Sequence, residues 1–268
     1  MNQSSGAPFP RAALPIINTP MADWPHLSNA PITEALLDIQ VRLPSDTKVE
    51  GLAIIHDSIR ERYPTPRTRM NWKGGIQIKE GEQPQVVSPE GGPTGYLFYS
   101  ADNRRVVQVR LDGFTFNQHR PYLNWATFRD EAREHWNRYR DLAKPEMVTR
   151  IALRFINRLD IPEPMGDFKN YILTAPDLAP GLPQGLANFF MRLAIPHPTE
   201  GYTALVTMTE DAPTKAGVAS LILDVDVFQE MAVAPSNEAI WGVFEQLRDY
   251  KNEVFFKSLT PKAIALFQ

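Results

Sequence analysis

Apolar and polar residues alternate along several segments of the chain with the two-residue period of half-buried strands. This pattern predicts strands over residues 32–43, 69–78, 95–100, 104–116, 148–161, 186–195, 202–209 and 218–228. A Gly/Pro-rich loop is expected over 80–93, and the turn residues at 101–103 are typical of a hairpin.

Other segments carry the three-to-four-residue spacing of amphipathic helices. Two long helices are predicted over 123–143 and 237–257, each with one apolar face to lay on a sheet. A shorter helix is predicted over 48–62, which Pro64 ends, and a short helix or turn over 168–173.

The order of these elements repeats along the chain. The sequence VRLP at 41–44 corresponds to LDIP at 159–162, and Trp125 with Phe128 corresponds to Trp241 with Phe244. We therefore predict an α+β fold in which two pseudo-repeated β-α-β-β-β-α units form an antiparallel-rich curved sheet with helices on one face. The expected division is a Pro-rich extended arm at 1–30, a first repeat at 31–146 and a second at 147–268.

Composition narrows the class of protein. The 268 residues are 43% hydrophobic and include no cysteine, which excludes disulfides, thiolate catalysis and Cys-ligated metals. Twenty-eight Lys and Arg against 31 Asp and Glu give a net charge of −3, so nucleic acid would need a local basic patch. Without a membrane-spanning apolar run or a leader pattern, a cytoplasmic location and no membrane partner are expected.

Arginines gather on one side of two predicted strands. Ile151, Leu153 and Phe155 alternate with Arg150, Arg154 and Arg158, and the strand at 104–116 places Arg104 and Arg110 opposite its valines. If the strands are neighbours, these five arginines line one open face. Because guanidinium groups bind carboxylates and phosphates in pairs, they are candidate ligand- or anion-binding residues.

Pairing within the sheet is the alternative interpretation of this face. Asp224 and Asp226 share one side of the strand at 218–228, and Asp112 and Asp160 stand at strand ends. These carboxylates can neutralise the arginines without any ligand.

Catalytic chemistry has little support in the sequence. His119, in the loop before the first long helix, is a weak candidate site residue, and Asp224 with Asp226 is a weak candidate for a metal-assisted site. No histidine spacing predicts a metal site, and no phosphate-binding or nucleophile motif occurs. We therefore predict no catalytic residue, no metal and no cofactor, while an enzyme of unidentified class stays as an alternative.

Three segments carry a family resemblance. LSNAPITEA at 27–35, RFINRLDIP at 154–162 and KNEVFFKSLT at 251–260 together resemble a sporadically distributed bacterial family of about 250 residues with no assigned activity. The resemblance implies no catalytic residue, and it is compatible with a role in mobile or defence-associated bacterial systems.

The function expected from these observations is non-catalytic binding or assembly, with a protein partner or a homo-oligomer. The Arg-lined face or the Pro-rich arm is the expected contact surface. A nucleic-acid or nucleotide binder that uses Arg104, Arg110, Arg150, Arg154 and Arg158 is the alternative.

Overall fold

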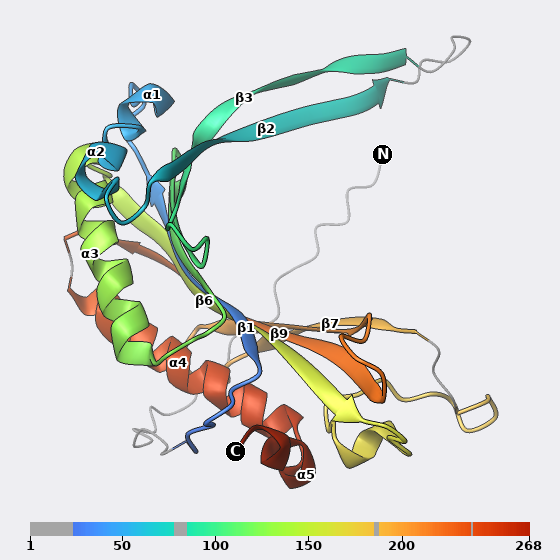
Figure 1. The fold of residues 1–268 in the computed structure, drawn as a ribbon. Helices are drawn as coiled ribbons and strands as arrows, with labels where there is room; N and C mark the ends of the chain where they lie inside the picture. The colour runs from blue at the N-terminus through green and yellow to red at the C-terminus, as the bar shows by residue number, and fades with distance from the viewer. Residues whose placement is uncertain (1–23, 78–84, 185–187, 237) are drawn as a thin grey trace.

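The computed structural model describes residues 24–77, 85–184, 188–236 and 238–268, which include one sheet of nine strands. Each pair of neighbouring strands is antiparallel, in the order β2-β3-β4-β5-β1-β6-β9-β8-β7 (Figure 1). The strands are β1 Ile32–Arg42, β2 Thr65–Gln77, β3 Gln85–Tyr99, β4 Arg105–Arg110, β5 Gly113–His119, β6 Met147–Pro162, β7 Phe190–Pro196, β8 Thr203–Asp211 and β9 Val218–Val233.

Two long helices, α3 Trp125–Ala143 and α4 Ala239–Ser258, cover the convex side of the curved sheet (Figure 1). Asn124 begins α3, since its side chain accepts a hydrogen bond from the backbone N–H of Thr127 at 2.9 Å. The remaining helices are short: α1 Val49–Leu52, α2 Ile55–Ile59, α5 Pro261–Ile264 and the 3₁₀ turns η1 Phe168–Asn170 and η2 Ala265–Phe267. Within the described ranges, no helix has the length and apolar character that a membrane crossing requires.

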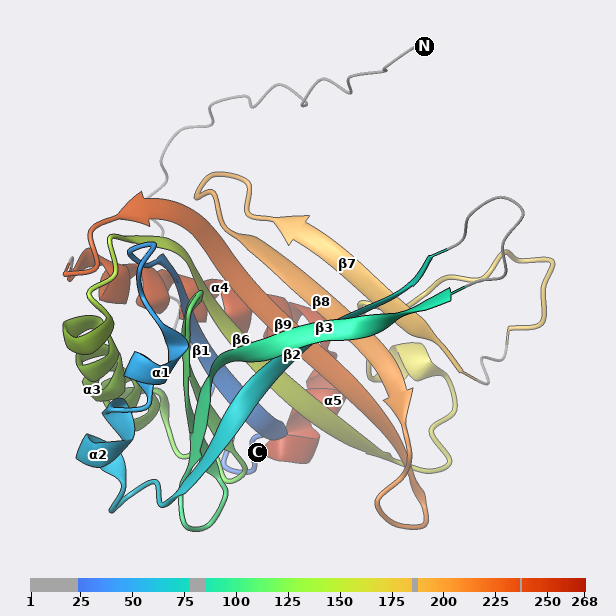
Figure 2. The same ribbon diagram turned by 90° about the horizontal axis from the view of Figure 1, so that it is seen from above.

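One hydrophobic core fills the space between the sheet and the two long helices. Leu37 of β1, Phe155 of β6, Trp136 of α3 and Phe244 of α4 are almost completely buried within it. Burial of this apolar surface is the main favourable contribution to folding. The sheet runs without a break across the predicted boundary at 146/147, because β1 and β6 pair along most of their length (Figure 2).

Three sequence-based expectations about elements were wrong. The predicted helix at 48–62 is two short helices, α1 and α2. Of the predicted loop at 80–93, residues 85–93 belong to β3, which pairs with β2, and residues 80–84 lie outside the described residues. The predicted strand at 104–116 is the pair β4 and β5, with a tight turn between them. Gly113 allows that turn, because its φ is +155° and a Cβ there would stand 2.4 Å from the carbonyl oxygen of Ile39. The Pro-rich arm falls mostly on residues 1–23, outside the described residues.

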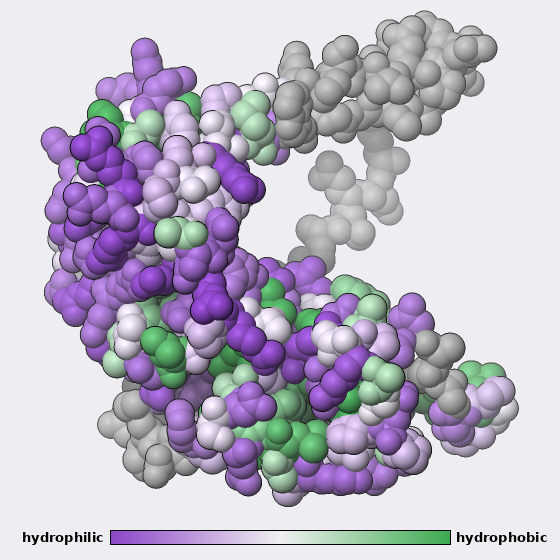
Figure 3. Space-filling view, in the orientation of Figure 1, coloured by the Kyte–Doolittle hydropathy of each residue, from purple (hydrophilic) through white to green (hydrophobic). Residues whose placement is uncertain are grey.

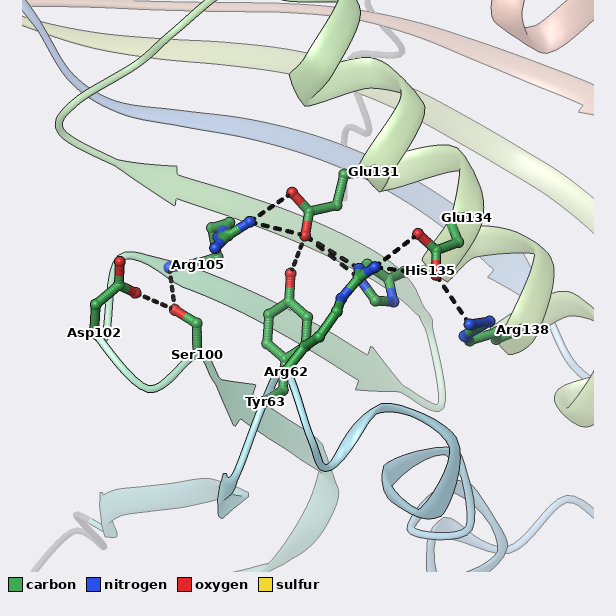
Figure 4. A network of polar contacts seen from close by, with 9 residues as sticks. All are labelled: Arg62, Tyr63, Ser100, Asp102, Arg105, Glu131, Glu134, His135 and Arg138. Carbon is green, nitrogen blue, oxygen red and sulfur yellow. Dashed lines mark hydrogen bonds and ion pairs between the residues drawn. The ribbon is translucent and has the colours of Figure 1, made fainter.

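An ionic network around the largely buried Glu131 connects the segment after α2 to α3 (Figure 4). The Tyr63 hydroxyl donates to Glu131 at 2.7 Å, and Arg105 and Arg62 approach the same carboxylate at 3.2 Å. Burial by itself would raise the pKa of Glu131, but the His135 ring, the Tyr63 hydroxyl and Arg105 lower it to about 2. This network is structural, since its groups neutralise one another.

Candidate functional site

The side of the sheet opposite α3 and α4 is concave. Space-filling shows the molecule hollowed on this side, with hydrophilic residues lining much of the hollow (Figure 3). On β1, Ala35, Leu37 and Ile39 are buried beneath the helices, so the alternate residues Glu34, Leu36 and Asp38 project to the concave side. We call this concave surface of the central strands the open face.

Two of the predicted arginines form tight pairs on the open face. Arg154 of β6 donates two hydrogen bonds to Asp224 of β9, from Nε to Oδ1 at 2.9 Å and from Nη2 to Oδ2 at 2.6 Å. Arg158 donates to Asp160 at 3.1 Å and to Asp211 of β8. A guanidinium that contacts a carboxylate through two nitrogens is held in a defined orientation, in addition to the charge attraction between the two groups. The cross-strand pairing considered from the sequence is present at both positions.

Arg110 is paired still more deeply. Its side chain is only 9% exposed and lies 2.9 Å from Asp38 of β1 and 2.8 Å from Asp112. Thr115 also contacts this guanidinium, and its hydroxyl donates to Asp38 at 2.6 Å. Burying such a charge is costly unless it is paired and hydrogen-bonded, as it is here.

Arg150 differs from the other three. It stands 3.6 Å from Asp38 and 3.7 Å from Asp226, beyond hydrogen-bonding distance, with its guanidinium 4.4 Å above the Phe228 ring. Oδ1 of Asp226 is buried and has no hydrogen-bond donor among the described residues. Burial raises the pKa of Asp226, against the attraction of Arg150 and Arg154. The cluster of Asp38, Arg150 and Asp226 therefore holds a carboxylate that lacks a donor.

Arg104 and His119 lie apart from these pairs. Arg104 is exposed in the turn before β4, where its backbone N–H donates to Asp102 at 3.1 Å. His119, at the end of β5, is half-buried, and its Nε2 lies 4.0 Å from Glu34. The structure thus brings together Arg110, Arg150, Arg154 and Arg158 with Asp224 and Asp226, without Arg104 or His119.

Sequence reasoning missed Asp38, which contacts two arginines from the strand between them, and Asp211, which pairs with Arg158. The alternation of Glu34, Leu36, Asp38 and Gln40 within the first strand was the signal that could have found Asp38. Asp211 had no comparable signal, because it reaches Arg158 only through the packing of β8 on β9.

The network on the open face carries more negative than positive charge. Six carboxylates accompany four guanidinium groups: Asp38, Asp112, Asp160, Asp211, Asp224 and Asp226 with Arg110, Arg150, Arg154 and Arg158. In the part of the chain that the structure describes, no three His, Asp or Glu side chains are grouped so that they could hold a metal ion. The arrangement is suited to recognition by hydrogen bonds and charge.

Comparison of the chain with known proteins found no similar protein. No protein-family model matches the chain, and neither a curated protein nor a solved structure shows detectable similarity to it. The resemblance carried by 27–35, 154–162 and 251–260 stays a prediction, and the chemistry of the chain's own residues is the basis for its function.

Proposed function

We propose that this chain is a non-catalytic binding or assembly protein that receives a protein partner on its open face. The observation that carries the proposal is the buried Oδ1 of Asp226, which lacks a donor, beside the loosely held Arg150. A buried carboxylate oxygen without a donor costs free energy, and a partner side chain that donates to it removes that cost.

The charge of the open face favours a basic group on the partner. Carboxylates outnumber guanidinium groups in its network, and three of the four arginines already hold carboxylates at hydrogen-bonding distance. A phosphate backbone would have to compete with those carboxylates for the arginines of the network. We therefore expect a lysine or arginine of the partner to enter between Asp38 and Asp226.

The proposal is tested with two labelled probes, an oligolysine peptide and a single-stranded DNA of similar length, by fluorescence anisotropy. We expect the peptide to bind, with an affinity that falls as salt is added, and the DNA to bind at least tenfold more weakly. Asp226→Asn should weaken peptide binding about fivefold or more. Asp141→Asn is the matched control, because Asp141 is 69% exposed on α3, on the other side of the sheet.

Equal effects of the two Asn variants, or preferential binding of DNA, would overturn the proposal; DNA binding would favour the nucleic-acid alternative. Sedimentation of the unmodified chain tests whether the partner is a second copy of the same chain. A concentration-dependent dimer that Asp226→Asn weakens would make the partner a second copy of this chain.

We also propose that the two halves are copies of one unit. The support is the order of strands outward from the centre, β1, β5, β4 and β3 on one side and β6, β9, β8 and β7 on the other, with a long helix after β5 and after β9. β2 has no counterpart in this scheme. An experimental structure tests the proposal, since strands and helices of true copies superpose under a single rotation.

A further inference from the structure

A pocket of about 660 Å³ lies on the helix-covered side of the sheet, away from the open face. Its walls are the segment 24–32, the loop 120–125, the middle of β6 and the last turns of α4. Volumes of this size are typical of small-molecule sites.

Aromatic rings make up much of the pocket wall. Trp125 and Tyr122 come from the loop and the start of α3, Phe155 from β6, and Phe256 from α4. Trp24 closes one side, stacked on Phe256 with ring centroids 5.3 Å apart. Flat apolar walls of this kind suit a planar organic ligand, because rings gain from stacking in addition to burial.

A buried cation without a counter-charge faces this wall. Lys251 of α4 is 8% exposed, and its Nζ lies 4.0 Å from the centroid of the Phe155 ring. Among the described residues it has no hydrogen bond and no ion pair, in contrast to the arginines of the open face. Lys251 points inward from α4, so its ammonium group lies against the Phe155 ring.

A second cation stands one turn earlier on the same helix. Arg248 also lines the pocket, 5.9 Å from the Trp125 ring centroid, and its nearest carboxylate is Glu245 at 3.9 Å. Lys251 and Arg248 of α4, with Arg120 of the loop, thus line a pocket whose other walls combine aromatic rings with polar and aliphatic residues. A cavity with this lining attracts a ligand that is anionic at one end and planar and apolar over the rest.

We propose that this pocket binds a small planar carboxylate, with Lys251 as the counter-charge of its carboxyl group and the surrounding rings as its apolar cradle. The carboxylate would give Lys251 the ion-pair partner that the described residues do not provide. Arg248 adds a second positive charge at the same end of the ligand.

Protonation of Lys251 supplies a second readout. Burial, and to a smaller extent the charge of Arg248, lower the pKa of Lys251 to about 7 against the opposing attraction of Asp249. The other titratable groups around the pocket are His26 from the segment 24–32, and Arg120 and Tyr122 from the loop. A bound carboxylate favours the charged amine, so binding at pH 8.5 should take up a proton at Lys251.

The experiment uses the full chain and isothermal titration calorimetry with benzoate, indole-3-acetate and the neutral benzamide. At least one carboxylate should bind, and benzamide should bind at least tenfold more weakly than benzoate. Titrations at pH 8.5 in buffers of different ionisation enthalpy should show uptake of up to one proton. Lys251→Met should lose tenfold or more in affinity and abolish the uptake, whereas Lys257→Met, which removes an exposed lysine of the same helix, should leave both unchanged.

Circular dichroism of Lys251→Met establishes that the variant folds. Independently, the ¹³Cε resonance of Lys251 in lysine-labelled protein should titrate near neutral pH without ligand and several tenths of a pH unit higher, or more, with it. No binding by either carboxylate at millimolar concentration, equal binding of benzoate and benzamide, or an unchanged affinity in Lys251→Met would each overturn the proposal. None of these outcomes bears on the open face, which lies on the other side of the sheet.

Discussion

The two sides of the sheet differ in whether a buried basic side chain is paired with carboxylates. On the open face Arg110 is 9% exposed yet held by Asp38 and Asp112 at hydrogen-bonding distance. On the helix-covered side Lys251 is buried just as deeply, and its ammonium group lies against the Phe155 ring with no ion-pair partner among the described residues. A guanidinium always stays charged and needs partners, whereas an amine can lose its proton and tolerate their absence. Arginines that are paired within the sheet are therefore interpreted as structural. The lysine that has no ion-pair partner among the described residues is interpreted as a ligand-binding group.

The largest effect expected from this contrast is on how stability depends on pH. Lys251 has a pKa of about 7 in the folded protein and near 10.5 when unfolded, so the unfolded chain holds more protons between these values. Stability should therefore rise from pH 7 to pH 9.5, towards a total on the order of 4 kcal/mol over the full interval. In Lys251→Met most of this rise should vanish, and the variant should be the more stable protein at pH 7.

Urea unfolding at pH 7 and pH 9.5 measures this difference, with Lys257→Met as the control that keeps the wild-type slope. A slope that is the same in Lys251→Met and wild type would show that Lys251 remains charged in the folded state. The contrast with the arginines would then disappear.

A smaller but still large loss is expected when a buried arginine loses its partner. Asp38→Ala removes the carboxylate that contacts both Arg110 and Arg150, and leaves Asp112 as the one carboxylate among the described residues that pairs with Arg110. Breaking a buried ion pair costs about 3 kcal/mol. Glu146→Ala, which breaks the exposed pair with Arg42, should cost about 0.5 kcal/mol or less. Denaturant unfolding at pH 7 measures the loss of unfolding free energy in both variants. Equal losses would show that the buried pairs of Arg110 contribute no more than an exposed pair.

The smallest expected change in stability is at the carboxylate that lacks a donor. Burial raises the pKa of Asp226, so a neutral amide of the same shape should change the free energy of unfolding by less than about 1 kcal/mol. The same variant, Asp226→Asn, is the one expected to weaken binding on the open face. A loss of stability as large as that of Asp38→Ala would show that Asp226 is a structural partner of Arg150 and would remove the basis for the proposed function.

Much of the strand content could be predicted because apolar residues alternate wherever one side of a strand is buried. Val107, Val109 and Phe116 carried that signal. The buried positions change from odd to even numbers between Val109 and Phe116, which marks the tight turn before Gly113 that the prediction of a single strand overlooked. The segment that contributes to β3 was assigned to a loop because of its glycines and prolines, although its backbone pairs with β2. Local composition could not indicate that pairing, which depends on a strand distant in the sequence.

The candidate site residues also divide into those that the local sequence pattern predicts and those that depend on tertiary packing. Arg110, Arg150, Arg154 and Arg158 were predictable, because a side chain opposite a buried one must face outward. Arg104 was placed with them by the same rule, but it lies in a turn, where the rule does not apply. Lys251 was not among the predicted site residues, because the depth at which a lysine lies depends on what packs over it.

The sequence by itself determined which residues share a side of each strand and helix, because periods of two and of three to four residues are local properties of the backbone. Only the tertiary structure decided which charges meet. Asp38 reaches two arginines through strand order, and Lys251 meets Phe155 instead of a carboxylate through the packing of α4 on β6. The physical reason is that electrostatic and hydrogen-bonding partners are chosen by distances of a few ångströms between segments far apart in the chain.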